Sequence, residues 1–262
     1  MKNLSISIMF FLCSFVLSAQ SQNSYPVKLR VGTYNVGHFN QGKLGGYQGE
    51  DVAEELQRWR NWISEQSLDI FGLVEWNSTF DKDGKIDATK ELLSPLYNNI
   101  HFGDENKWIY NGIATNYKLE NIRQVTLSKD YYAIIGDLKI GDKTVTIMST
   151  HVPWQVEFHE QATNDMIAEM KKYEYLICMG DMNAFDATQL KYQAEGFNIA
   201  NGGYQGWLVT APQNKAKGRP DGHHIDNIIT SKNIKIMNVK APDAGLSSLD
   251  HLPIIADLIF TW

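Results

Sequence analysis

The feature that most constrains the fold is a strand–helix–strand succession early in the chain. Residues 28–35, KLRVGTYN, alternate apolar and polar side chains, as a half-buried strand does. Residues 50–67 place four large apolar side chains at the spacing of an amphipathic helix: Val52, Leu56, Trp59 and Ile63. Residues 68–75, LDIFGLVE, then form a run typical of a buried strand. A crossover of this length connects parallel strands, so we expect a sheet with a helix on one face.

Further apolar runs have the length and composition of strands. They cover residues 110–119, 131–140, 144–154, 175–180, 223–231 and 251–262. A Gly-Asp-Lys turn at residues 141–143 predicts a hairpin between the second and third of these runs, and a helix is expected over residues 158–175. No linker of biased composition divides the chain, so we expect a single α/β domain over residues 21–262.

The first 20 residues have the layout of a secretory signal peptide, with one lysine, an apolar run, and then small and polar residues. Cleavage is expected near residues 18–20, and export to the periplasm or the extracellular space follows. The alternatives are a lipid anchor on Cys13 and an uncleaved membrane anchor. Leu12 stands where a lipoprotein signal has a small residue, and the apolar run is short for a spanning helix. We therefore expect no stable membrane insertion.

Charge and cysteine content narrow the possibilities further. Without the signal peptide the chain has one cysteine, Cys178, inside an apolar run; it is expected to be a packing residue rather than half of a disulfide. The formal net charge is −6, so no strong basic field holds nucleic acid nonspecifically. A nucleic-acid substrate is not excluded, because a bound metal ion can supply positive charge locally.

The apolar runs repeatedly end beside a polar residue suited to a metal ion or a phosphate group. Each residue alone has a structural explanation: Asn35 as a turn residue, His151 as a hydrogen-bonded core histidine, Asp226 as a strand-end charge. Together they form a set of oxygen ligands with two histidines. The set is Asn35, Glu75, His151, Asp181, Asn183, Asp226, Asp250 and His251.

This set suits metal-assisted phosphate chemistry. Oxygen ligands favour Mg²⁺ or Mn²⁺ over zinc. Hydrolysis of a phosphate ester needs positive charge at the nonbridging oxygens, an activated water, and help for the leaving oxygen. A metal ion on Glu75, two histidines and a well-held aspartate meet these needs. We therefore expect a phosphoester hydrolase that uses Mg²⁺ or Mn²⁺, and no protein partner is predicted.

Six motifs, in order along the chain, resemble those of the endonuclease/exonuclease/phosphatase superfamily, the DNase I-like proteins. They are TYNVGHFN, LVEW, STHVPW, GDMNAF, HIDNIIT and LDHLPIIADL. The G-D-x-N and D-H-x-P elements are the specific ones. The resemblance implies a four-layered α/β sandwich, in which two mixed β-sheets pack face to face with helices outside.

The resemblance also implies a role for each residue of the set. Glu75 matches the principal metal carboxylate, with Asn35 beside it and Asp250 near the metal. Asp181 matches the residue that orients or deprotonates water, and Asn183 positions it and the phosphate. For the remaining three, His251 matches the catalytic histidine, Asp226 the carboxylate that fixes its tautomer, and His151 the second phosphate-facing histidine. Either Asp181 or the His251–Asp226 pair can be the general base.

The chain departs from the family pattern at four positions. Val74 precedes Glu75 where a glutamine is frequent, and Leu249 replaces the usual serine before Asp-His. His224 stands where an arginine often precedes Ile-Asp, and Asn116 ends a segment that usually ends in serine. None of these changes removes a predicted ligand.

Three functions are compatible with the sequence. The first is an exported nuclease acting on DNA or RNA, supported by the two histidines and by Lys215, Lys217 and Arg219 before the Asp226 strand. The second is a sphingomyelinase-like or small-molecule phosphodiesterase, in which Trp154 and Trp207 line an apolar rim. The third is a noncatalytic binding module, disfavoured because each expected site residue is present.

A polar loop at residues 79–90 resembles a calcium-binding loop in part. Asp81, Asp83 and Asp87 stand at suitable positions, but Thr79 and Lys90 occupy the places of the first aspartate and the final bidentate glutamate. We interpret this segment as a solvated turn.

Overall fold

The computed structural model describes residues 27–106, 108–128, 130–246 and 249–262. These residues form two six-stranded sheets. The first sheet has the order β11-β12-β1-β2-β4-β3. Its strands are β1 (Val27–Asn35), β2 (Ile70–Val74), β3 (Asn99–Phe102), β4 (Gly112–Thr115), β11 (Ile234–Lys240) and β12 (Ile254–Phe260).

The second sheet has the order β5-β6-β7-β8-β10-β9. Its strands are β5 (Leu119–Ser128), β6 (Tyr131–Ile140), β7 (Lys143–His151), β8 (Leu176–Asp181), β9 (Phe197–Ile199) and β10 (Asp226–Ser231). Both sheets are mixed, because β1 and β2 pair in parallel, as do β7 and β8, while the other neighbours are antiparallel.

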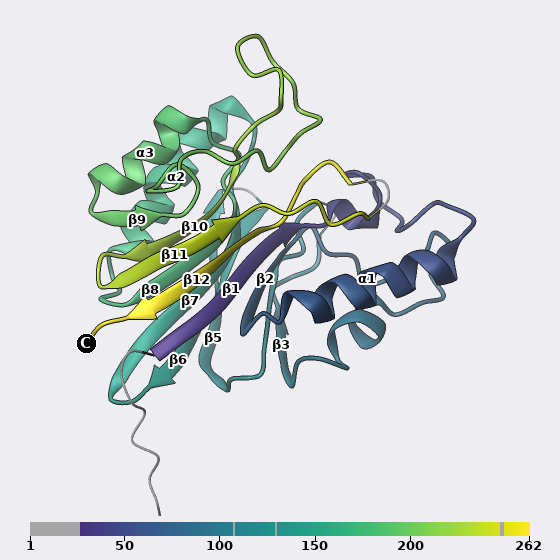
Figure 1. The fold of residues 1–262 in the computed structure, drawn as a ribbon, viewed down its shortest axis with the longest axis horizontal. Helices are drawn as coiled ribbons and strands as arrows, with labels where there is room; N and C mark the ends of the chain where they lie inside the picture. Colours follow the sequence, from purple (N-terminus) through teal and green to yellow (C-terminus); the bar gives the residue numbers. More distant parts are fainter. Residues whose placement is uncertain (1–26, 107, 129, 247–248) are drawn as a thin grey trace, which may run out of the picture.

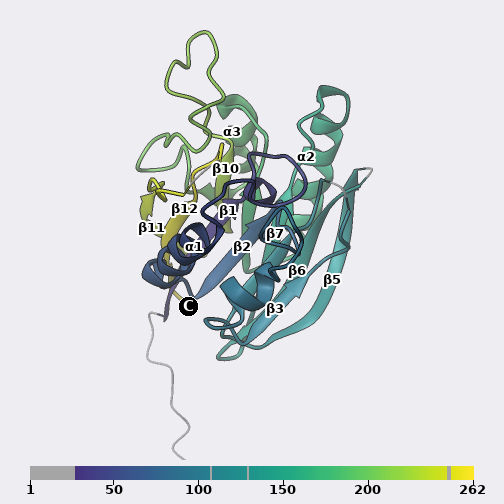
Figure 2. The same ribbon diagram turned by 90° about the vertical axis from the view of Figure 1, so that its right-hand side faces the viewer.

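The helices lie outside the two sheets (Figures 1 and 2). They are α1 (Val52–Gln66), α2 (Val156–Met170) and α3 (Asp186–Ala194), together with the short turns η1 (Gly37–Phe39) and η2 (Thr89–Leu93). Leu56, Trp59 and Ile63 of α1 are buried against the first sheet, as their helical spacing predicts. The predicted four-layered sandwich of two mixed sheets is confirmed.

Three apolar cores separate the four layers. The central core joins the sheets through side chains such as Val31 of β1 and Ile177 of β8. One outer core lies between α1 and the first sheet, and the other lies between α2 and the second sheet. Because side chains alternate across a strand, a strand such as β8 supplies both a central and an outer core. In β8, Ile177 and Met179 belong to the central core and Cys178 to the outer one, which confirms Cys178 as a packing residue.

Several local expectations are confirmed and others need correction. The hairpin at residues 141–143 joins β6 to β7. The second helix covers Val156–Met170 rather than residues 158–175, because the chain turns at residues 171–172 before β8. Strands β3, β5, β9 and β11 were not predicted. All four lie at sheet edges; β3 and β9 are very short, and β5 and β11 carry exposed side chains, so they lack the long apolar runs that identify buried strands.

The 79–90 loop is an ordered turn. Asp81 Oδ1 accepts hydrogen bonds from the backbone N–H groups of Lys85 (2.9 Å) and Ile86 (2.8 Å), and Lys85 Nζ pairs with Asp83. Backbone and lysine donors therefore satisfy these carboxylate oxygens, in agreement with the predicted turn.

Two expectations concern export and the membrane. The predicted signal peptide lies outside the residues that the structure describes. Among the described residues, no helix has both the length and the apolar character needed to cross a membrane.

Candidate active site

Four of the predicted residues lie at one end of the sandwich because of strand alternation. Asn35, His151 and Asp181 end β1, β7 and β8, and Asp226 begins β10. Each continues the row of side chains that faces the central core, as Asp181 continues from Ile177 and Met179. The strand register places Asp181 beside His151 in β7 and beside Asp226 in β10. The site therefore lies between the two sheets at the end of the central core.

Asp181 is at the centre of the site, with 1% of its surface exposed. Its Oδ1 accepts a hydrogen bond from the backbone N–H of Asn183 (2.8 Å), and its Oδ2 accepts one from Asn35 Nδ2 (3.0 Å). Burial and the charge of Asp226 raise the pKa of Asp181, although nearby histidines and the Asn183 N–H oppose the shift. A raised pKa makes this carboxylate a better proton acceptor near neutral pH.

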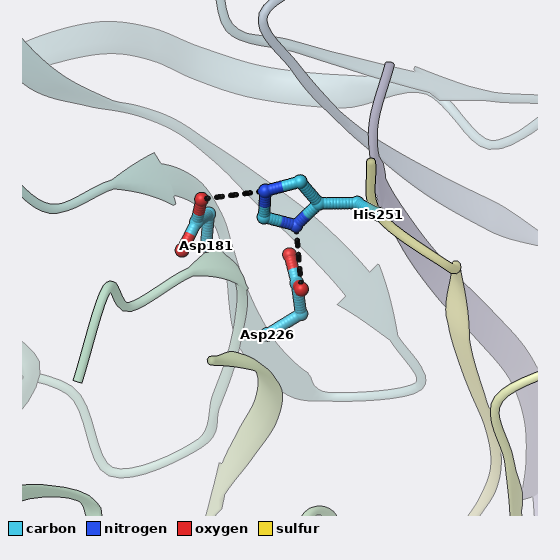
Figure 3. A group of neighbouring side chains, drawn as sticks. All are labelled: Asp181, Asp226 and His251. Atoms are coloured by element: carbon cyan, nitrogen blue, oxygen red, sulfur yellow. Dashed lines mark hydrogen bonds and ion pairs between the residues drawn. The ribbon is translucent and has the colours of Figure 1, made fainter. Parts of the chain in front are cut away.

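His251 lies between two carboxylates (Figure 3). Its Nδ1 is 2.8 Å from Asp226 Oδ2, and its Nε2 is 3.7 Å from Asp181 Oδ2. Asp226 is itself held by Thr210 Oγ1, which accepts the Asp226 backbone N–H (3.0 Å). Burial lowers the pKa of His251, but the charges of Asp226 and Asp181 outweigh it and raise that pKa well above its ordinary value. The two carboxylates therefore favour the protonated form of His251.

The pKa of His151 is shifted in the opposite direction to that of His251. Its Nε2 lies 3.7 Å from Asp181 Oδ2 and 3.0 Å from Asn183 Nδ2, which also donates to the carbonyl of Val152 (2.9 Å). Burial lowers the pKa of His151 to about 4 despite the charge of Asp181. The site thus places a histidine with a raised pKa and one with a lowered pKa on either side of a carboxylate. Opposite pKa shifts of this kind distinguish groups that donate protons from groups that accept them.

Glu75 lies across from the histidines, directly after β2. Its Oε1 accepts a hydrogen bond from Asn35 Nδ2 (3.1 Å) and lies 3.7 Å from His151 Nε2. Burial raises the pKa of Glu75 to about 7, against the opposing effects of His251 and Asn35. Its φ of 49° is a left-handed conformation that non-glycine residues seldom adopt, and such conformations concentrate at functional sites.

Asp250, in the segment before β12, completes the predicted set and lies near the turn that follows β1. A Cβ placed on Gly37 would lie 3.5 Å from Asp250 Oδ1, and one placed on Gly42 would lie 3.9 Å from Glu75 Oε2. The two glycines therefore leave space beside both carboxylates. In addition, φ is +50° at Gly37, and a Cβ there would lie 2.7 Å from the Gly42 nitrogen, so only glycine fits this turn.

His38 belongs to the site but was not predicted from the sequence. It is 2% exposed; its Nδ1 lies 3.1 Å from the carbonyl oxygen of Trp76, and its Nε2 lies 3.6 Å from Glu75 Oε2. Burial lowers the pKa of His38. The available signal was the position of His38 three residues after Asn35 within the TYNVGHFN motif.

The site offers two groupings that could be considered for a metal ion. Ligand atoms of Asp181, Asp226 and His251 lie within 4.8 Å of one another. However, His251 Nδ1 is hydrogen-bonded to Asp226 and its Nε2 faces Asp181 at 3.7 Å, so both ring nitrogens are directed at carboxylates rather than at an ion. Glu75, with Asn35 and Asp250 beside it, is the better candidate, as the sequence predicts.

The electrostatics of the described residues fit a divalent cation at Glu75. Among the ion pairs of these residues, the partners of Glu75 and Asp181 are histidines. Of these, His38 and His151 have lowered pKa values. Buried carboxylates without a strong cation carry a desolvation cost, which the raised pKa of Glu75 reflects. A divalent ion bound by oxygen ligands would offset that cost.

Comparison with known proteins identifies the class to which this sandwich and site belong. The model of the endonuclease/exonuclease/phosphatase family matches residues 32–251, which span the chain from β1 to His251. The chain therefore belongs to this family of phosphoester hydrolases. This confirms the family resemblance of the sequence motifs, whereas the individual residue roles stay predictions.

Solved structures share the fold at low sequence identity. An endonuclease/exonuclease/phosphatase from Bacteroides vulgatus has a TM-score of 0.68 and 17% identity, over 90% of this chain and 100% of that one. The human Nocturnin catalytic domain with bound sulfate has a TM-score of 0.65 and 19% identity, over 89% of this chain and 95% of that one. D. rerio TDP2 complexed with a single-strand DNA product has a TM-score of 0.63 and 14% identity, over 88% of this chain and 98% of that one. No curated protein matches the sequence.

Proposed function

We propose that this hydrolase is an exported, divalent-metal-dependent nuclease that cleaves phosphodiester bonds in DNA or RNA. The observation that carries the proposal is the placement of Asp181 between two histidines with opposite pKa shifts, beside the largely buried carboxylate of Glu75. This arrangement provides a proton acceptor, a cation and a cation-binding carboxylate within one site.

In this proposal Glu75 and Asp250 bind the metal ion, with Asn35 beside them. When bound, Mg²⁺ or Mn²⁺ would supply positive charge to the nonbridging oxygens of the phosphate. Asn35 also has a positioning role, because its Nδ2 donates to both Glu75 and Asp181 while its Oδ1 accepts the backbone N–H of Gly37 (3.0 Å). This one amide fixes the spacing between the metal carboxylate and the proposed base.

The protein residues divide the proton transfers between them. Asp181, with its raised pKa, accepts a proton from the attacking water as the new P–O bond forms. His251, held as a cation by Asp226, donates a proton to the leaving oxygen as the old P–O bond breaks. The 3.7 Å separation of Asp181 Oδ2 and His251 Nε2 lets the first proton return to His251 after the reaction. His151 and Asn183 orient the phosphate.

A local positive surface supports a nucleic-acid substrate. Lys215 and Lys217 are exposed, and Arg219 Nη1 is fixed 2.8 Å from Asp186 Oδ1. These residues belong to the long connection between β9 and β10, the segment that rises at the top of Figure 1. The structural neighbour that holds a single-strand DNA product has the same fold. Export is supported only by the signal-peptide pattern at residues 1–20.

One observation favours a lipid or small-molecule phosphodiesterase as the second candidate. Trp154 is 67% exposed and Val156 is 88% exposed, three and five residues after His151. Exposed apolar side chains beside a catalytic site suit an apolar substrate surface. Trp207, the other tryptophan considered for this role, instead stacks on His224 with ring centroids 5.6 Å apart.

The test is a substrate panel with the chain lacking residues 1–20. Plasmid DNA, single-stranded DNA, RNA, sphingomyelin and bis-p-nitrophenyl phosphate are each incubated with Mg²⁺, Mn²⁺ or EDTA. We expect metal-dependent cleavage of nucleic acid that EDTA abolishes. Release of a lipid headgroup while all nucleic acids stay intact would replace the nuclease with the second candidate. Inactivity on the whole panel, for the wild type as for Asp181→Asn, would indicate a binding module.

A further inference from the structure

His38 has an unused nitrogen that points into the proposed metal site. The side chain is 2% exposed, and its Nε2 is a buried polar atom with no hydrogen-bond partner among the described residues. Leaving a buried polar atom without a partner costs about 1–3 kcal/mol, so such atoms at functional sites often await a ligand. The carboxylate oxygen that Nε2 faces is Glu75 Oε2, 3.6 Å away.

The hydrogen bond on the other side of the ring fixes the tautomer. Nδ1 lies 3.1 Å from the Trp76 carbonyl oxygen, which can only accept, so the proton of the neutral imidazole is on Nδ1. Nε2 therefore presents a lone pair toward Glu75. This is the arrangement in which metal-binding histidines occur, with the second ring nitrogen donating to a carbonyl or carboxylate.

A direct hydrogen bond between His38 and Glu75 does not explain this contact. The Nε2–Oε2 separation of 3.6 Å exceeds hydrogen-bonding distance. With the proton on Nδ1, two lone pairs also face each other. A cation bound by both atoms would convert this repulsion into attraction.

The backbone holds His38 in this position. Its N–H donates to the Glu75 carbonyl (2.8 Å), and Val36 N–H donates to the Val74 carbonyl (2.9 Å), so the η1 turn is tied to the end of β2. His38 itself has a left-handed conformation, with φ of 53°. Gly37 and Gly42 leave space beside Asp250 and Glu75 that larger residues would fill. The turn thus holds His38 close to Glu75.

We propose that His38 Nε2 is a direct ligand of the divalent ion, together with Glu75, and that it shifts the preference of the site from Mg²⁺ toward Mn²⁺. This inference rests on the proposed metal dependence. An imidazole ligand favours a transition-metal ion, whereas Mg²⁺ prefers oxygen ligands. His38 would therefore determine which metal ion the enzyme selects.

Spectroscopy of bound Mn²⁺ tests the proposal without reference to activity. Wild-type protein with ¹⁵N-labelled histidine is loaded with Mn²⁺, and electron spin echo envelope modulation is used to detect a directly bound histidine nitrogen. We expect this coupling in the wild type, its loss in His38→Asn, and its retention in His151→Ala. Asparagine suits position 38 because it tolerates left-handed conformations. Absence of histidine coupling in the wild type would overturn the proposal whether or not any variant folds.

Metal affinity gives the second measurement. By calorimetric titration, we expect His38→Asn to weaken Mn²⁺ binding at least about 10-fold and Mg²⁺ binding by less than about 3-fold. His101→Asn is the matched control, because His101 Nε2 is also buried and unpartnered but lies on β3; it should change neither affinity. Equal losses for both ions would overturn the selectivity. A protein that binds Mn²⁺ through His38 but cleaves no nucleic acid would retain this inference and reject the nuclease proposal.

Discussion

The charge state of the site depends on single side chains, and Asp226 illustrates this at the residue scale. Asp226→Asn removes the largest of the effects that raise the pKa of His251, so that pKa should fall. Stabilisation from protonated His251 is present below its unfolded pKa and is lost as pH rises through its folded pKa. In the variant, this loss should therefore occur at lower pH. NMR titration of the His251 ring in metal-free protein measures it; an unchanged titration would contradict the electrostatic argument.

Asp181 is the residue on which the proposed chemistry depends most. Asp181→Asn removes the proton acceptor while preserving the size of the side chain, so kcat should fall about 10²–10⁴-fold. Its hydrogen-bond acceptor toward the Asn183 N–H can remain, so the protein should stay folded. Steady-state kinetics on the cleaved substrate, with circular dichroism for folding, measures both. Asp165→Asn, at an exposed position on α2, is the control; a similar loss there would show a nonspecific effect.

At the scale of elements, the close approach of β7 and β8 is what places His151 beside Asp181. Gly180 permits that approach, since its φ is +151° and a Cβ there would lie 1.9 Å from the Thr150 carbonyl oxygen. Gly180→Ala should therefore destabilise the protein by about 3 kcal/mol or more. Gly84→Ala also has positive φ (+68°) but open space around the Cβ, so it should cost only about 1–2 kcal/mol. Denaturant unfolding distinguishes the two, and equal losses would refute the steric explanation.

The elements also show what could be predicted from the sequence. Asn35, His151 and Asp181 were found because each ends a regular apolar run, and the same alternation explains why all three face the space between the sheets. His38 was not found, because it lies in a turn without periodicity. Its position depends on hydrogen bonds to residues nearly 40 positions away, to Glu75 and Trp76. Pairings of this kind are set by tertiary structure and leave no local pattern.

At the scale of the whole molecule, the fold was predictable and the substrate was not. The order of the motifs implied the sandwich, and the structure has both mixed sheets. Edge strands such as β5 and β11 escaped prediction because exposed positions interrupt their apolar pattern. Substrate choice depends instead on loops such as the one between β9 and β10, whose chemistry the fold does not determine.

Because the net charge is −6, a nucleic-acid substrate must be bound by individual basic residues rather than by the overall field of the protein. A substitution of Arg219 tests one such contact. Asp186 holds this guanidinium at 2.8 Å, and it lies over the exposed Phe185 ring, 5.7 Å from the centroid. If Arg219 contacts a substrate phosphate, Arg219→Gln should raise KM for a single-stranded oligonucleotide about 3–10-fold and leave cleavage of bis-p-nitrophenyl phosphate unchanged. The slope of log KM against log salt concentration should fall by about 0.7, as for one lost phosphate contact on a single strand.

The control variant for this contact is Arg123→Gln. Arg123 is likewise paired with an aspartate, Asp137, at 3.2 Å, but it lies on β5 at the far edge of the second sheet. It should therefore change neither KM nor the salt dependence. An Arg219→Gln enzyme with unaltered KM and salt slope, in a wild type that does cleave the oligonucleotide, would remove the β9–β10 connection from the binding surface. Because the molecule is acidic overall, the phosphate contacts of the strand would then depend on the proposed metal ion and on His251, His151 and Asn183 in the site.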